Sequence, residues 1–94
     1  MDKYEILYII RGTVDDDLKQ KTVEKFEALV TAQGGTVDSL DKWGMKKFAY
    51  KIDKQDTEGY YVLMNVTCSK EAQAEIDRQM RNDESVIRQM ILRK

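Results

Sequence analysis

The sequence predicts one α+β domain whose strands and helices follow the order β-α-β-β-α-β. The chain has 94 residues, enough for a single domain spanning residues 1–94. Two stretches repeat apolar residues at the helical period, and four are rich in β-branched and aromatic residues. With 41% hydrophobic and 35% charged residues, the composition is that of a globular domain, not a disordered chain.

The first strand and the first helix follow from local pattern. Residues 4–10 are almost all apolar, which predicts a central strand covered on both sides. Asp15, Asp16 and Asp17 predict the first turn of a helix, where carboxylates face the positive end of the helix dipole. The apolar face of this helix comprises Leu18, Thr22, Val23, Phe26, Leu29 and Val30. The glycine pair at 34–35 predicts its end.

The middle of the chain predicts a hairpin. Residues 36–52 form a long extended segment, and Gly44 within it indicates a bulge or bend. Residues 53–58 are polar and turn-like, and residues 59–66 predict the third strand.

The last third predicts a helix and a strand. Ser69 is a favourable N-cap, and Ala72, Ile76 and Met80 share one helical face. A turn at residues 82–84 precedes a final strand over residues 86–92. The complete order is the ferredoxin-like plan. Right-handed crossovers would place both helices on one face of a four-stranded antiparallel sheet, leaving the other face open.

Alternation along the strands predicts which side chains occupy that open face. We assign the set containing Asn65 to it, which leaves Val62 under the helices with Ile6, Tyr8 and Ile10. The predicted exposed apolar patch is Leu7, Ile9, Tyr61, Leu63, Met90 and Leu92. Such a patch is typical of a partner surface. The alternative is that side chains of the long second strand fold over it.

Composition argues against several kinds of chemistry. The chain has no histidine and one cysteine, Cys68, which excludes serine–histidine and cysteine–histidine catalysis and an intrachain disulfide. Asp15 to Asp17 lack the spacing of a calcium loop, so a helix start explains them better than a metal site. Arg11 and Gly12 are too few for a phosphate-binding loop. We therefore expect no enzymatic activity, no metal and no cofactor.

The chain also shows no apolar run long enough to span a membrane and no signal peptide, so we expect a cytoplasmic location without membrane contact or a small-molecule substrate. Its net charge is -1. Any RNA contact must therefore come from local clusters of cations.

Two such clusters are present. Residues 43–51 interleave lysines with aromatic residues, which is typical of nucleic-acid binding. The alternative is a sheet edge whose lysines discourage aggregation. A second cluster, Arg88, Arg93 and Lys94, lies near the C-terminal end of the sequence. Arg78 and Arg81 are expected to be ordinary solvated charges on the second helix.

Several segments, in order along almost the whole chain, carry a family resemblance. They are residues 4–5, residues 43–50, residues 60–66 and residues 86–90. Together they resemble bacterial small-subunit ribosomal protein six, and Gly44 to Tyr50, with its paired lysines and Ala-Tyr ending, is the most specific part. The chain departs from the family in having Lys51 where proline is common and in lacking an acidic C-terminal tail.

The resemblance implies a non-catalytic ribosomal protein. It implies binding to the central domain of small-subunit ribosomal RNA, as a heterodimer with small-subunit ribosomal protein eighteen. The RNA-binding residues we predict are Lys46, Lys47, Arg88, Arg93 and Lys94. The partner-binding residues we predict are Leu7, Ile9, Trp43, Tyr50, Tyr61, Leu63 and Met90.

Two other functions compete with this one. A stand-alone binder of single-stranded RNA would stack bases on Tyr61, since residues 59–62 loosely resemble the aromatic third strand of RNA-recognition motifs. An acylphosphatase-like enzyme shares the topology but needs a phosphate loop that the sequence does not provide.

Overall fold

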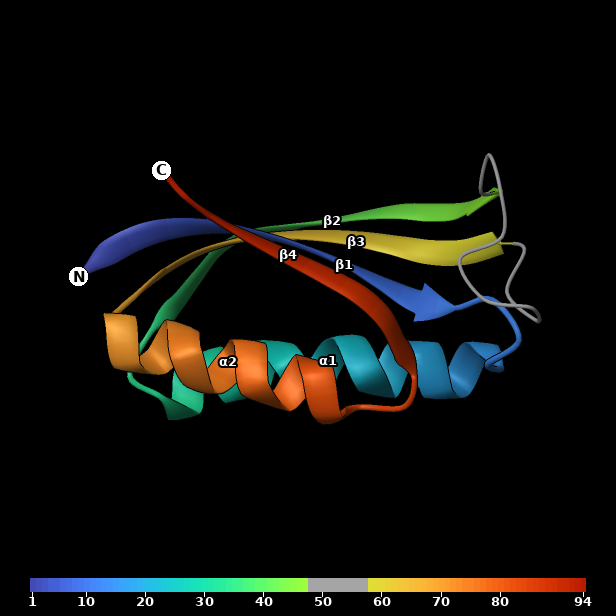
Figure 1. Cartoon of the computed structure of the whole chain (residues 1–94), viewed down its shortest axis with the longest axis horizontal. Helices are drawn as coiled ribbons and strands as arrows, with labels where there is room; N and C mark the ends of the chain where they lie inside the picture. Colours follow the sequence, from blue (N-terminus) through green and yellow to red (C-terminus); the bar gives the residue numbers. More distant parts are fainter. Residues whose placement is uncertain (48–57) are drawn as a thin grey trace.

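A computed structural model describes residues 1–47 and 58–94. The elements are β1 (Asp2–Arg11), α1 (Asp16–Ala32), β2 (Thr36–Lys47), β3 (Glu58–Cys68), α2 (Lys70–Asn82) and β4 (Val86–Arg93). The four strands form one sheet in the order β2-β3-β1-β4, and each neighbouring pair is antiparallel. Figure 1 shows both helices beneath one face of this sheet. The predicted ferredoxin-like arrangement is therefore confirmed.

The element boundaries agree with the sequence analysis to within two residues for β1, β3 and β4. Glu58, expected in a turn, is the first residue of β3. The expected continuation of the second strand over residues 48–52, and most of the expected turn, lie outside the described residues.

Local capping explains where the helices begin and end. The carboxylate of Asp15 accepts a hydrogen bond from the N–H of Leu18 at 2.8 Å, and the hydroxyl of Ser69 accepts one from the N–H of Ala72 at 3.1 Å. Both contacts satisfy an N–H group that the first helical turn leaves unpaired. Helix α1 ends before Gly34, whose φ of 82° lies in the left-handed region that favours glycine. Asp15, expected in the first turn, is therefore the N-cap, and the first turn begins at Asp16.

The core lies between the helices and the sheet. Phe26, Val30, Ile76, Met80 and Val62, which we expected to be inaccessible, are each 0% exposed. The rings of Phe26 and Tyr8 meet edge to face, with 5.4 Å between their centroids. Contacts of this kind bind α1 to the centre of the sheet.

Two details of the packing complete the fold. Leu18, expected on the apolar face of α1, is 44% exposed, because it lies in the first turn beside a hollow lined by Lys21, Lys25 and Asp83. Cys68 is fully buried, and burial raises the pKa of its thiol.

Within residues 1–47 and 58–94, neither helix has the combination of length and apolar character needed to cross a bilayer.

Strand β2 is irregular in two places. Its register against β3 shifts between Val37 and Ser39 and again between Lys42 and Gly44. Gly44 has a φ of 88°, which fits the bulge expected there. Because each bulge changes which side chains face outward, the pattern along β2 does not follow a simple alternation.

Candidate functional site

The open face of the sheet is built from aligned side chains of all four strands. From β4 through β1 and β3 to β2, the register forms three rows: Arg88, Ile9, Tyr61 and Gly44; Met90, Leu7, Leu63 and Asp41; Leu92, Glu5, Asn65 and Ser39. The residues that alternate with these along β1 and β3, Ile6, Tyr8, Val62 and Met64, face the helices and are fully buried. The predicted choice of faces thus agrees with the observed burial.

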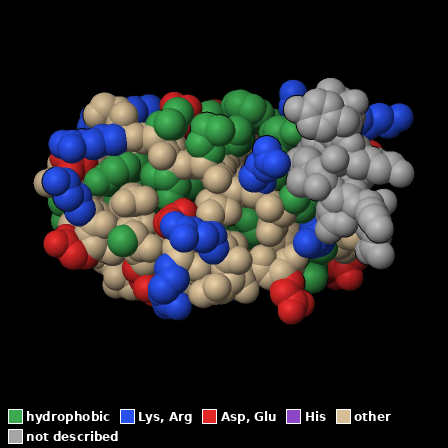
Figure 2. Space-filling model, in the orientation of Figure 1, with side chains coloured by type: hydrophobic (Ala, Val, Ile, Leu, Met, Phe, Trp, Pro, Cys, Tyr) green, Lys and Arg blue, Asp and Glu red, His purple; other side chains and the backbone are tan. Residues whose placement is uncertain are grey.

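Exposure varies strongly across this face. Met90 is 54% exposed and Trp43 is 46% exposed, whereas Leu7, Tyr61 and Leu63 are half-buried. Figure 2 shows hydrophobic side chains gathered on the sheet side of the molecule, at the upper margin of the view, with Lys and Arg side chains nearby. The face therefore presents apolar surface to solvent.

The predicted exposed patch is wrong at Ile9. It lies on the open face, but its side chain is only 7% exposed. Its strand, β1, is central, and in the register Ile9 lies between Tyr61 on one side and Arg88 on the other. Large neighbours in one row cover a shorter side chain between them, so Ile9 supports the surface and offers little area of its own.

An aromatic pair connects the edge strand to its neighbour. Trp43 of β2 and Tyr61 of β3 stack with 6.4 Å between ring centroids and 10° between ring planes. The ammonium group of Lys46 lies 5.6 Å from the centre of the Trp43 ring, within range of a cation–π contact. One exposed corner of the open face thus combines an aromatic surface with a cation.

The structure does not bring the five predicted RNA-binding cations together. Lys46 and Lys47 end β2, and Arg88 lies near the start of β4, at the same end of the sheet. Lys94 is six residues beyond Arg88 along an extended strand, which is about 20 Å.

At the end of the sheet opposite Arg88, both Arg93 and Lys94 have acidic neighbours. Arg93 forms an ion pair with Asp2 at 3.2 Å, and Lys94 lies 3.9 Å from the carboxylate of Glu5. The two basic groups therefore define two separate surfaces. Arg78 and Arg81 pair with Glu75 and Asp77 on their own helix, as expected of solvated helix charges.

Asn65 was expected on the open face, but its polar partners from β2 were not. The side-chain amide of Asn65 donates a hydrogen bond to the Ser39 hydroxyl at 2.9 Å, and the Thr67 hydroxyl donates one to Asp38 at 2.6 Å. Gly44 indicated one irregularity in β2, but no residue indicated the second register shift, between Val37 and Ser39, where these β2 residues lie. Tyr50, a predicted partner contact, lies outside the described residues.

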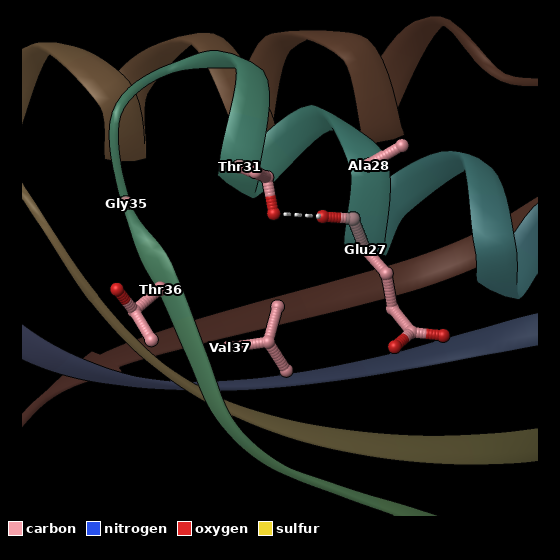
Figure 3. A pocket seen from close by; sticks show the side chains of 6 residues that line it. All are labelled: Glu27, Ala28, Thr31, Gly35, Thr36 and Val37. Atoms are coloured by element: carbon pink, nitrogen blue, oxygen red, sulfur yellow. Dashed lines mark hydrogen bonds between the residues drawn. The ribbon is translucent and has the colours of Figure 1, made fainter.

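A hollow of about 420 Å³ lies on the helix side of the sheet. Figure 3 shows its lining: Glu27, Ala28 and Thr31 from α1, and Gly35, Thr36 and Val37 from the start of β2 and the residue before it. The Thr31 hydroxyl donates a hydrogen bond to the Glu27 carbonyl, which spans one turn of the helix. In the described residues, no group of three or more His, Cys, Asp or Glu side chains is placed so that it could hold a metal ion.

The fold and the open face define a class: a small α+β domain that presents one face of its sheet for binding. The family model for ribosomal protein S6 matches residues 3–93. Small ribosomal subunit protein bS6 of Clostridium botulinum strain Hall is 45% identical over 92 residues, covering 98% of this chain and 97% of that protein. Its counterpart from Alkaliphilus metalliredigens is 43% identical over 93 residues, covering 99% of this chain and 97% of that protein.

The crystal structure of 30S ribosomal protein S6 from Thermotoga maritima superposes with a TM-score of 0.92 at 28% identity, covering 99% of this chain and 87% of that one. The chain belongs to the ribosomal protein S6 family. It is a structural, non-enzymatic protein of the small ribosomal subunit, with a cytoplasmic, ribosomal location. The resemblance seen in the sequence is thereby confirmed.

Proposed function

We propose that this chain binds the central domain of small-subunit ribosomal RNA together with small-subunit ribosomal protein eighteen, as a heterodimer, during assembly. The observation that carries the proposal is the exposed Trp43, stacked on Tyr61 at the margin of an apolar sheet face. Interface energy concentrates in aromatic anchors of this kind, surrounded by apolar area.

The charge of the chain supports the need for a partner. With 16 Lys and Arg against 17 Asp and Glu, its net charge is -1. Affinity for RNA depends on cations that displace counterions from phosphates, and here most cations are offset by carboxylates. A basic partner protein would supply the missing phosphate contacts.

Two regions of the sheet divide the proposed work. Leu7, Leu63, Met90 and Trp43 would contact the partner protein, because they give this face its apolar area. Lys46, Lys47 and Arg88, at one end of the sheet, would contact RNA phosphates. Arg93 and Lys94 lie at the opposite end and would form a second, separate phosphate contact.

Stand-alone binding of single-stranded RNA is the competing function. It requires a free aromatic ring on which a base can stack. The ring of Tyr61 is already stacked against the indole of Trp43. Trp43 offers an exposed ring instead, but Lys46 lies 5.6 Å from the centre of that ring. These contacts favour the heterodimer over base stacking.

Isothermal titration calorimetry tests the proposal directly. A central-domain RNA fragment is titrated with this chain alone, with ribosomal protein eighteen alone, and with the mixture, at physiological salt. We expect tight binding only by the mixture. If this chain alone binds the fragment as tightly as the mixture does, the cooperative function is wrong.

A further inference from the structure

The two edges of the sheet differ in how well they are protected against strand addition. Strand β2 carries two bulges, and Lys42, Lys46 and Lys47 lie along it. Bulges and lysines are features that keep other strands away from an edge. Strand β4 pairs regularly with β1 from Arg88 to Arg93, and its one irregularity lies before that stretch. Within the described residues, no strand pairs with the outer side of β4.

The direction of the backbone groups along β4 follows from two hydrogen bonds. The N–H of Lys94 donates to the carbonyl of Lys3 at 2.9 Å, and the N–H of Arg11 donates to the carbonyl of Ser85 at 2.8 Å. In an antiparallel pair, alternate residues direct both backbone groups toward the neighbouring strand. Lys94, Leu92, Met90 and Arg88 therefore direct their N–H and C=O groups toward β1. The residues that alternate with them, including Gln89 and Ile91, direct these groups to the free edge.

Side chains on the open-face side of this edge form an ordered series: Arg88, Met90, Leu92 and Lys94. A cation lies at each end, and the two apolar side chains between are 54% and 53% exposed. No carboxylate occurs from residue 86 to residue 94. An added strand would place its alternate side chains directly beside these four.

We propose that the outer edge of β4 binds an extended segment of a partner protein by strand addition, and that the segment is acidic at both ends and apolar between. Backbone hydrogen bonds to Gln89 and Ile91 would supply affinity, and the alternate side chains would supply specificity. The pattern read along the segment is Glu or Asp, then two apolar residues, then Glu or Asp, each separated by one residue. This function goes beyond the RNA and heterodimer binding proposed above.

Charge argues against a second copy of this chain as the occupant. Each β4 edge carries three cations, Arg88, Arg93 and Lys94, and no Asp or Glu, although Asp2 and Glu5 of β1 lie beside Arg93 and Lys94. Two such edges would repel when paired, whereas an acidic strand would be attracted. RNA also carries negative charge, but it cannot complete a backbone hydrogen-bond ladder.

A peptide experiment tests the proposal. The ligand is a synthetic seven-residue peptide in which threonine alternates with glutamate, valine, valine and glutamate, in that order. Binding is followed by calorimetry and by shifts of backbone amide resonances in NMR spectra. We expect the largest shifts along β4, with binding to a matched peptide carrying lysine for glutamate weaker by about tenfold or more.

Two variants at one position isolate the backbone contribution. Gln89→Pro removes an N–H group that points away from β1, so the β1–β4 ladder is retained. Gln89→Ala keeps that N–H group, and both variants lose the same side-chain hydrogen bond to Asp77. We expect Gln89→Pro to weaken peptide binding by about tenfold or more and Gln89→Ala to leave it within about twofold. Equal binding by the two variants would overturn the proposal.

A charge reversal keeps the test decisive if Gln89→Pro does not fold. The Arg88→Glu, Lys94→Glu double variant should prefer the lysine peptide over the glutamate peptide. Three results would each refute an acidic partner segment at this edge. The first is a double variant that still prefers the glutamate peptide, and the second is a set of amide shifts centred on β2 when the peptide binds. The third is self-association of the wild-type chain that Gln89→Pro abolishes. Gln89→Pro should leave cooperative RNA binding with ribosomal protein eighteen intact, so the two proposals fail separately.

Discussion

Trp43 and Tyr61 stack with their rings 10° from parallel, and this contact fixes an exposed indole of the edge strand β2 to the side of β3 that faces away from the helices. The contact gives Trp43 a defined position although its side chain is 46% exposed. A rigid, exposed aromatic side chain loses little conformational entropy on binding, which favours its use as an interface anchor.

Trp43→Ala should therefore weaken binding to ribosomal protein eighteen. We expect a loss of about 2 kcal/mol or more, equivalent to about thirtyfold in Kd, as for other aromatic interface anchors. Calorimetry with the isolated partner measures it. Leu18→Ala is the matched control, because Leu18 is 44% exposed but lies on α1, away from the open face. Equal losses for the two variants would show that the open face is not the partner surface.

The cations at one end of the sheet should determine the salt dependence of RNA binding. In the Lys46→Ala, Lys47→Ala, Arg88→Ala triple variant, the slope of log K against log salt should fall by about three units, about one for each phosphate contact. The slope is measured with the partner present. The Arg78→Ala, Arg81→Ala double variant on α2 is the control, and its slope should match that of the wild type. An unchanged slope in the triple variant would exclude these residues from the RNA contact.

Removing the ring of Phe26 should destabilise the fold strongly. The side chain is fully buried and packs edge to face on Tyr8. Phe26→Ala should lower the free energy of unfolding by about 3–5 kcal/mol, since the transfer term and the cavity term add. Chemical denaturation measures this value. A loss below about 1 kcal/mol would contradict the central place of Phe26 in the core.

The carboxyl of Asp83 should make stability depend on acid pH. Burial raises its pKa, but hydrogen bonds from the ammonium of Lys25 at 2.8 Å and from the N–H of Ser85 outweigh burial, so the pKa lies below its ordinary value of 3.8. The unfolded chain therefore binds this proton more readily than the folded one. The stabilisation is complete above the ordinary value and is lost as the pH falls through the lower, folded pKa.

Asp83→Asn should make the free energy of unfolding depend less on pH in the acid range. Denaturation midpoints are compared for the wild type and the variant from neutral pH down to about pH 2. The variant should be less stable at neutral pH, and the difference should narrow as the pH falls below about 4. A difference that stays constant over the whole range would show that this carboxyl does not titrate differently in the folded and unfolded chains.

The sequence by itself determined the elements, because their signals are local. Asp15 and Ser69 cap the helices through hydrogen bonds to N–H groups three residues ahead. Phe26 and Ile76 belong to helical faces that repeat every few residues, and the alternation around Val62 was sufficient to separate the two faces of β3. These features depend on residues close together in the chain, so the sequence alone predicts the fold class and the open face.

Only the tertiary structure decided how the surface is assembled. Ile9 is covered because neighbouring strands place Tyr61 and Arg88 beside it, a matter of register between distant segments. Trp43 of β2 stacks on Tyr61 of the adjacent strand β3, in a stretch of β2 whose alternation is interrupted by a bulge at Gly44. Arg88 and Lys94 are close in sequence but far apart in space, because an extended strand advances about 3.3 Å per residue. Long-range pairing sets each of these relationships, and no local pattern encodes it.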